Sequence, residues 1–328
     1  MANLQTKYMG LSLRNPLIAS SSGLTASAEQ IIELDKAGIG AVVLKSLFEE
    51  QIQMDVDSQR TNNMYGTYSE VENYVGFYTR KHNLTAYLNT IKESKAKTSI
   101  PIIASVNCIS SSEWIEFAQK IQEAGADALE LNMFIMASDA SFNGRDIEQN
   151  YFDIVAKIKP LIQIPIALKI SPYISSLANF ATQLSQTGIN SLVLFNRFYR
   201  PDIDLENMQL TGSKDVLSYP HENANVLRWL GILKGQVSCD LSASTGINDA
   251  QSVLKNMVAG ANVVQLASVF YRDGLSVIGK TIFEMEAWLD AHKYQDVNEL
   301  IGMLSQKSSN KPMMYERAQF MRYFSDVK

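Results

Sequence analysis

One phrase recurs four times in this chain: a turn containing glycine, followed by a short apolar run that ends in a polar residue. The copies lie at residues 37–45, 124–132, 187–196 and 259–268. In each copy the glycine suits the end of a helix, and the apolar run suits a strand that is buried on both faces, as parallel sheets require. The phrase therefore predicts four parallel strands, each entered from a helix.

Four more apolar runs lie between these copies, and three of them begin at or just after a proline, which is tolerated at the first residue of a strand. They cover residues 16–20, 101–106, 165–170 and 237–242. Segments with helical apolar spacing separate the runs, at 112–124, 177–184, 225–233 and 249–258. Eight strand–helix units predict a closed (β/α)8 TIM barrel of the α/β class rather than an open sheet.

The chain has 328 residues, more than the roughly 250 that a TIM barrel needs. We expect one domain over residues 1–328, with the surplus in two insertions at about 48–83 and 198–221 and in a C-terminal helical extension at about 295–328. Both insertions follow the C-terminal end of a predicted strand, the face where barrel enzymes carry their working loops.

Charge and cysteine content narrow the class of ligand. With 29 basic and 34 acidic residues the net charge is -5 and no dense Lys/Arg block occurs, which argues against nucleic acid or an anionic membrane as partner. Cys108, Cys239 and the three histidines lack metal-ligand spacing, so no metal is expected. No signal pattern or apolar run of about 18 residues is present, which predicts a cytoplasmic protein with a small-molecule ligand.

Polar residues stand at the ends of the predicted strands. They are Ser20, Lys45, Ser105, Asn107, Asn132, Lys169, Asn196, Ser244 and Ser268. A partly buried ammonium group without an anion is costly, so Lys45 and Lys169 together favour a ligand site at the barrel mouth. Either lysine alone could be a surface residue just past a strand, and a single asparagine is often a turn former.

The last two strands end in small residues, Ser244-Thr245-Gly246 and Ala267-Ser268. Small residues let backbone N–H groups approach a phosphate, and TIM barrels often bind phosphate after strands seven and eight. The alternative is a tight turn with a glycine needed only for packing.

Several segments resemble, in order and spacing, the FMN-dependent dihydroorotate dehydrogenases, and the similarity runs from Leu11 to about Gly274. The segments are Asn15–Ser22, Val43–Lys45, Asn73–Gly76, Glu130–Asn132, Ala167–Ser171 and Ser244–Ile247. The resemblance implies an FMN-dependent oxidoreductase acting on CH–CH groups, which oxidises dihydroorotate to orotate in pyrimidine biosynthesis, or a related substrate. A homodimer is expected by analogy.

The resemblance also implies roles for individual residues. Lys45 and Lys169 would flank the flavin, with Lys169 holding the negative charge that develops on reduction. Asn73 and Gly76 would grip the substrate, and Asn132, Asn196 and Arg197 would contact substrate or flavin. The remaining cofactor contacts would be Ser20, Ser21, Asn107, Ser244, Thr245, Gly246, Ala267 and Ser268.

The chain departs from the family pattern where a proton must be removed from the substrate. Ile135 occupies the position of the family's Cys or Ser base, and an isoleucine cannot accept a proton. Cys108, Ser138 and Tyr199 lie on nearby predicted loops and are candidate replacements. Arg197 replaces a serine, which suggests either a second acidic group on the ligand or a solvated arginine. The electron acceptor is not indicated.

Two other functions stay open at this point. The first is a non-catalytic flavin- or phosphate-binding barrel that has lost turnover, favoured by Ile135 and by replaced glycines at Ala243, Thr245 and Ala267. The second is a barrel aldolase or isomerase that forms a Schiff base on Lys45 or Lys169.

Overall fold

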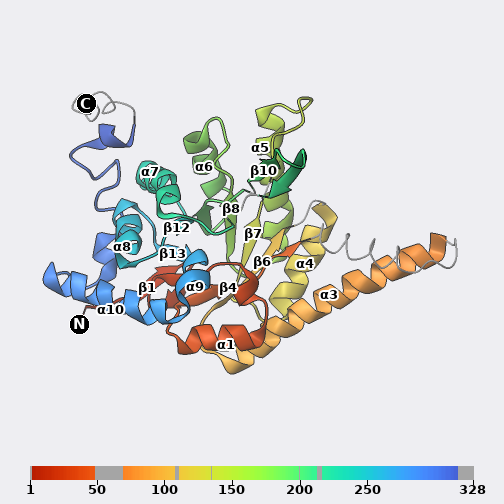
Figure 1. Ribbon diagram of the computed structural model, residues 1–328, viewed down its shortest axis with the longest axis horizontal. Helices are drawn as coiled ribbons and strands as arrows, with labels where there is room; N and C mark the ends of the chain where they lie inside the picture. Colours follow the sequence, from red (N-terminus) through yellow and green to blue (C-terminus); the bar gives the residue numbers. More distant parts are fainter. Residues whose placement is uncertain are drawn as a thin grey trace.

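A computed structural model describes residues 2–48, 69–107, 111–133, 135–198, 200–212 and 216–316. Eight parallel strands pair in chain order, and the last, β13, pairs with the first, β3, which closes the barrel (Figure 1). The strands are β3 (Leu17–Ala19), β4 (Ala41–Val43), β6 (Ile102–Asn107), β7 (Ala128–Asn132), β8 (Ile166–Ile170), β9 (Ser191–Leu194), β12 (Asp240–Ser244) and β13 (Val263–Leu266). Each overlaps one of the eight predicted runs, with β6 and β12 extending one and two residues past theirs, so the predicted (β/α)8 barrel is confirmed.

Helices follow the strands and surround the barrel (Figure 1). They are α1 (Ala28–Lys36), α3 (Ser69–Lys97), α4 (Ser111–Glu123), α5 (Gly144–Ile158), α6 (Leu177–Ser185), α7 (Asn223–Leu233), α8 (Ala250–Ala259), α9 (Ser268–Asp273) and α10 (Ser276–Ala291). Local sequence sets several helix starts. In α1 the Ser27 side chain accepts a hydrogen bond from the Gln30 N–H, and the Gln30 side chain accepts one from the Ser27 N–H. This pair of bonds is a capping box. No described helix is long and apolar enough to cross a membrane.

A β-hairpin covers the N-terminal end of the barrel, and sequence analysis did not predict it. Strands β1 (Thr6–Tyr8) and β2 (Leu11–Leu13) pair antiparallel. Met9 and Gly10 join them with φ of 53° and 81°, and positive φ at both central residues is what a tight hairpin turn needs. Tyr8, Met9 and Leu13 pack onto apolar side chains inside the barrel, so the hairpin closes this end.

The first predicted insertion holds two elements in its described part. Strand β5 (Leu47–Phe48) pairs with the end of β6, and α3 begins at Ser69, within the predicted insertion. The second contains an antiparallel hairpin of β10 (Pro201–Asp204) and β11 (Gln209–Gly212), and then the 3-10 helix η3 (Pro220–Glu222).

The predicted C-terminal helical extension is only partly described. Between residues 295 and 316 the regular helical segments are two short 3-10 helices, η4 (Val297–Leu300) and η5 (Pro312–Tyr315), with turns around them. Residues 317–328 lie outside the described part.

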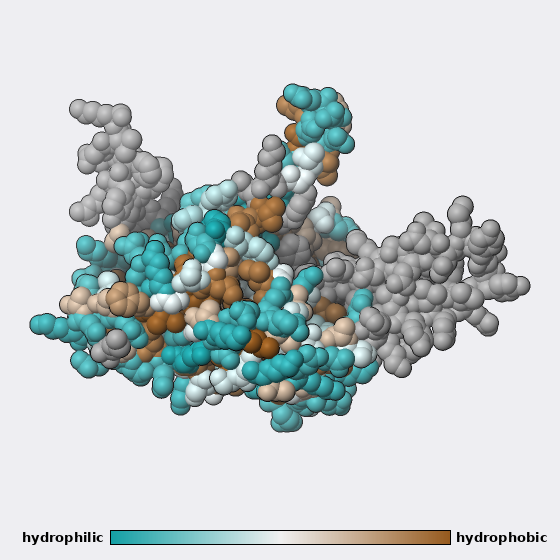
Figure 2. Space-filling model, turned by 60° about the horizontal axis from the view of Figure 1, so that its bottom comes forward, coloured by the Kyte–Doolittle hydropathy of each residue, from teal (hydrophilic) through white to brown (hydrophobic). Residues whose placement is uncertain are grey.

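The molecular face in Figure 2 is largely hydrophilic, with hydrophobic residues gathered near its middle.

Candidate functional site

A cavity of about 140 Å³ lies at the C-terminal ends of the strands. It brings together residues from β8, β12 and β13 and from the segments that follow β3, β9, β12 and β13. Its lining is Ser20, Ser21, Lys169, Phe195, Arg197, Ser218, Ser244, Thr245, Gly246, Ile247, Gln265, Ala267 and Ser268. The structure therefore joins Lys169 with both predicted phosphate-binding turns and with the serines that follow β3.

Lys169 supplies positive charge to this cavity. It lies on β8 and only 9% of its surface is exposed. Its Nζ donates to Ser20 Oγ and to Gln265 Oε1, both at 3.5 Å, and these acceptors are neutral. A buried ammonium held by neutral acceptors favours an anionic ligand nearby.

The turn after β12 has a shape that only certain residues adopt. Thr245 and Gly246 have φ of 81° and 73°, and a Cβ on Gly246 would lie 2.6 Å from the Asn223 nitrogen and 2.7 Å from the Tyr219 oxygen. Glycine is required there by both angle and space. The threonine keeps the left-handed backbone although its side chain is β-branched.

Ser218 ties the two predicted phosphate-binding turns together. The Gly246 N–H donates to Ser218 Oγ at 3.2 Å, and Ser218 Oγ donates to Ser268 Oγ at 3.0 Å. Ser268 Oγ also accepts the Ser218 N–H at 2.9 Å. Small side chains thus line one end of the cavity, with hydroxyl and N–H groups close by.

These features fit the phosphate end of FMN. Small residues keep the space open, and Lys169 offers charge at its edge. Asn132, at the end of β7, does not line this cavity, but its Oδ1 is buried and has no hydrogen-bond partner among the described residues. An amide acceptor in this state suits an N–H donor on a ligand.

Asn196, by contrast, is engaged within the protein. Its Nδ2 donates to the Met133 carbonyl at 3.0 Å and to the Lys169 carbonyl at 3.2 Å, and the residue is buried. These bonds join the segment after β7 to the end of β8. The amide group therefore has a structural role beside its predicted contact with substrate or flavin.

Arg197 lines the cavity, but its guanidinium is tied to the second insertion. Nε donates to Glu222 Oε2 at 3.1 Å, and the NH1 and NH2 groups donate to the carbonyls of Val216 and Leu217. Burial alone would raise the pKa of Glu222, but the hydrogen bond from Arg197, a backbone N–H and the charges of Arg197 and Arg200 together lower it. The arginine is thus ion-paired rather than freely solvated.

Other predicted residues lie away from this cavity or outside the described part. Lys45 is exposed and does not line it, and Asn107 is half-buried at the end of β6 and does not line it either. Asn73 and Gly76 fall within α3, where their surroundings lie outside the described residues. The roles of these four residues stay predictions.

A serine cluster connects the cavity to the neighbouring strands. Ser21 Oγ lies 3.0 Å from Ser46 Oγ, which lies 2.7 Å from Ser105 Oγ. Ser105, one of the polar residues singled out in the sequence, is thus buried in a hydroxyl chain that reaches the cavity through Ser21.

The position of the family's base carries no proton acceptor. Ile135 is half-buried and packs against the main hydrophobic core. On the same segment Ser138 is exposed, and its N–H donates to the Met136 carbonyl at 2.9 Å. Cys108 and Tyr199, the other candidate bases, lie outside the described residues.

Sequence analysis missed two polar residues at the site, Gln265 in the cavity wall and Glu130 behind it. Glu130 and Gln265 are 1% and 2% exposed, and Gln265 Nε2 donates to Glu130 Oε2 at 2.6 Å. Gln265 Oε1 accepts from Ser20 Oγ at 3.1 Å. The available signal was a polar residue inside an apolar strand, as in Leu129-Glu-Leu131 and Val264-Gln-Leu266.

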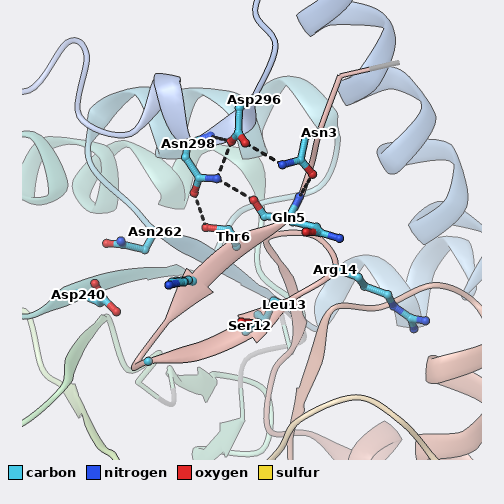
Figure 3. A pocket seen from close by; sticks show the side chains of 12 residues that line it. Asn3, Gln5, Thr6, Ser12, Leu13, Arg14, Asp240, Asn262, Asp296 and Asn298 are labelled. Atoms are coloured by element: carbon cyan, nitrogen blue, oxygen red, sulfur yellow. Dashed lines mark hydrogen bonds between the residues drawn. The ribbon is translucent and has the colours of Figure 1, made fainter.

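A larger cavity of about 750 Å³ lies at the opposite end, beside the β1–β2 hairpin (Figure 3). Four of its polar side chains, those of Asn3, Thr6, Asp296 and Asn298, bond to one another. Asn3 donates to Asp296 at 2.7 Å, and Thr6 donates to Asn298 at 2.7 Å. These bonds join the start of the chain to η4, which gives the polar lining a structural role.

Comparison with known proteins identifies the family of this chain. A family model described as dihydroorotate dehydrogenase matches residues 3–289. The chain belongs to the dihydroorotate dehydrogenase family.

Individual relatives are similar at low identity over most of their length. The catalytic subunit of dihydroorotate dehydrogenase B (NAD(+)) from Thermoplasma acidophilum is 26% identical over 314 residues, which are 92% of this chain and 99% of the relative. Dihydroorotate dehydrogenase A (fumarate) from Limosilactobacillus reuteri is 27% identical over 280 residues, 83% of this chain and 89% of the relative. Relatives named for different electron acceptors thus match about equally well.

Proposed function

We propose that this chain is an FMN-dependent oxidoreductase that oxidises dihydroorotate, or a related small cyclic carboxylate, at a CH–CH bond. The observation that carries this proposal is the cavity in which Lys169 meets the two small-residue turns at Ser244–Gly246 and Ala267–Ser268. The dihydroorotate dehydrogenase family membership supports the same reading.

Each part of the cavity has a defined task in this proposal. The turns after β12 and β13 hold the FMN phosphate, and Ser20 and Ser21 line the flavin. The chemistry that bound FMN would supply is acceptance of a hydride from the substrate. Lys169 places an ammonium where negative charge develops on reduction, a stabilisation that is strong in a site shielded from water.

The residue that takes the substrate proton is the open part of the reaction. Ile135 offers no acceptor, and loss of a general base costs about two to four orders of magnitude in rate. We therefore expect either slow turnover of dihydroorotate or a related substrate whose proton leaves to another group.

The test is spectroscopic. Purified protein, reconstituted with FMN if needed, should show flavin absorbance, and anaerobic dihydroorotate should bleach it. The Lys169→Ala variant should bind FMN but be reduced much more slowly, whereas Lys36→Ala, which removes an exposed lysine paired with Glu33, should behave as the wild type. A colourless protein that ignores added FMN would contradict the proposal.

A second candidate is a non-catalytic flavin- or phosphate-binding barrel. Ile135, packed against the core where the base is expected, is the observation that favours it. The same experiment separates the two, because this protein would bind FMN and show no bleaching with dihydroorotate or with related cyclic carboxylates.

We also propose a homodimer with cytoplasmic location. The β10–β11 hairpin offers an apolar surface for self-association, because Ile203 and Leu210 pair across it and are exposed.

A further inference from the structure

Four buried polar side chains form a hydrogen-bonded network that runs from the cavity wall into the barrel interior. Glu130 lies on β7, Gln265 on β13, Ser20 just after β3 and Lys169 on β8, and each is at most 9% exposed. Strands β7 and β13 lie four positions apart around the eight-stranded barrel. The bond of 2.6 Å from Gln265 to Glu130 therefore crosses the barrel interior.

The hydrogen bonds of this network all donate toward Glu130: Lys169 and Ser20 donate to Gln265, and Gln265 donates to Glu130. An ionised carboxylate only accepts, so Glu130 fixes the end of the Gln265 amide that faces it, namely the NH₂ group. The amide oxygen must then face the other way, where it accepts from Ser20 Oγ at 3.1 Å and from Lys169 Nζ at 3.5 Å. A reversed amide would set its NH₂ group against the ammonium of Lys169.

The amide between the two charges also matters. A carboxylate in direct contact with Lys169 would satisfy the ammonium and compete with an anionic ligand. The neutral amide orients the ammonium instead and leaves its charge available to the cavity. Lysine has three N–H donors, and the hydrogen bonds of Lys169 to described residues use two, so one can reach a ligand.

We propose that Glu130 is a positioning residue, which acts through Gln265 to hold the Lys169 ammonium against the cavity and thereby raises the reduction potential of bound FMN. The position of the Lys169 ammonium is a property of the protein alone, whereas the effect on the reduction potential rests on the proposed function. Separate measurements test the two.

Two simpler roles for Glu130 predict different results. As a through-space charge, it would repel the electrons of reduced flavin, so removing it would raise the potential. As a barrel filler with no link to Lys169, its replacement by glutamine would change neither the ammonium nor the potential. Positioning alone predicts that the potential falls when the charge is removed.

The first measurement needs no cofactor. In the full chain labelled with ¹⁵N-lysine, only ammonium groups protected by burial and hydrogen bonds exchange slowly enough to give cross-peaks. The Lys169 peak is the one missing in Lys169→Met. The peak should be lost or clearly shifted in Glu130→Gln. It should be unchanged in Ser242→Ala, which alters a fully buried barrel residue outside the hydrogen-bonded network of Glu130, Gln265, Ser20 and Lys169.

The second measurement is the flavin midpoint potential. It should fall in Glu130→Gln in the same direction as in Lys169→Met, and at least half as far, while Ser242→Ala keeps the wild-type value. Gln265→Met, close in size to glutamine, removes the bridge but leaves the carboxylate. It should reproduce both effects, which keeps the test available if Glu130→Gln does not fold.

The two measurements distinguish positioning by Glu130 from the two simpler roles and from a failure of the proposed function. An unchanged Lys169 peak in a folded Glu130→Gln or Gln265→Met variant, or a potential that rises in Glu130→Gln, would overturn the inference. If the wild type does not bind FMN, the proposed function fails, and the ammonium spectra alone decide whether Glu130 positions Lys169.

Discussion

Gly246 and Gly274 share a positive φ but have very different surroundings. Both have φ of 73°, but a Cβ on Gly246 would meet backbone atoms at 2.6 and 2.7 Å, whereas no atom lies within 4 Å of a Cβ on Gly274. The pair therefore contrasts a positive φ in open space with a positive φ in close contact.

We predict that Gly274→Ala lowers the free energy of unfolding by about 1–3 kcal/mol, because φ of 73° with ψ of 179° is a conformation almost confined to glycine. Gly246→Ala should cost at least about 2 kcal/mol more, because backbone atoms must move as well. It should also weaken FMN binding at least tenfold in a fluorescence titration, with Gly274→Ala near the wild type. Equal effects of the two substitutions would show that the turn after β12 is not packed as described.

The ion pair of Glu222 should make the second insertion sensitive to acid. Its folded-state pKa is lowered, so the stabilisation is complete above the unfolded-state value of about 4.3 and is lost as the pH falls through the lower folded value. We predict that Glu222→Gln lowers the free energy of unfolding by about 1 kcal/mol at pH 7. The difference from the wild type should shrink between about pH 5 and pH 3 in denaturation curves. A constant difference would exclude ionisation of Glu222 as its source.

The residues of the site were predictable where a chemical type and a strand end coincided. Lys169 and the small-residue turns met both conditions, and the structure brings them into one cavity. Glu130 and Gln265 lie inside strands, where sequence shows only an interruption of an apolar run. Their partnership depends on strands that meet across a closed barrel, and linear spacing does not carry that information.

At the scale of elements, the eight strands followed from their apolar runs because a strand buried on both faces leaves few polar positions. The β1–β2 hairpin escaped prediction, because each of its strands has three residues and Met9 is not a usual turn residue. Its place depends on the packing of Tyr8, Met9 and Leu13 against the end of the folded barrel, which the sequence does not show.

Tyr8 shows how this hairpin closes the barrel. The side chain is fully buried, and burial, followed by the charge of Glu130, raises the pKa of its hydroxyl. That hydroxyl has no hydrogen-bond partner of normal geometry among the described residues. The ring therefore stabilises the fold by packing rather than by its polar atom.

We predict that Tyr8→Ala lowers the free energy of unfolding by about 3–5 kcal/mol, as for other large buried aromatic residues. Tyr8→Phe should change it by less than about 1 kcal/mol, because no hydrogen bond is lost. Urea denaturation of the two variants measures both values. A phenylalanine variant as unstable as the alanine variant would mean that the hydroxyl, not the ring, holds the hairpin in place.

At the scale of the whole molecule, the β10–β11 hairpin carries apolar side chains that its own fold leaves uncovered. Ile203 and Leu210 face each other across the two strands and are 63% and 76% exposed. Leu205 and Met208, near the turn, are also exposed. Clustered exposed apolar residues often mark protein–protein contacts, so we assign the hairpin to the proposed homodimer interface.

We predict that Leu210→Asp converts the dimer to a monomer in sedimentation equilibrium, because a carboxylate placed in an apolar interface loses its hydration without gaining a partner. Gln209→Asp adds the same charge one residue earlier, where alternation along the strand directs the side chain to the opposite face. That control should remain dimeric. Leu210→Asp should unfold within about 0.5 kcal/mol of the wild type once association is accounted for, whereas Gln209→Asp, which places a carboxylate directly opposite Asp204, should lose up to about 1 kcal/mol. If Leu210→Asp and Gln209→Asp sediment alike, the two faces of the hairpin are equivalent and self-association must use another surface.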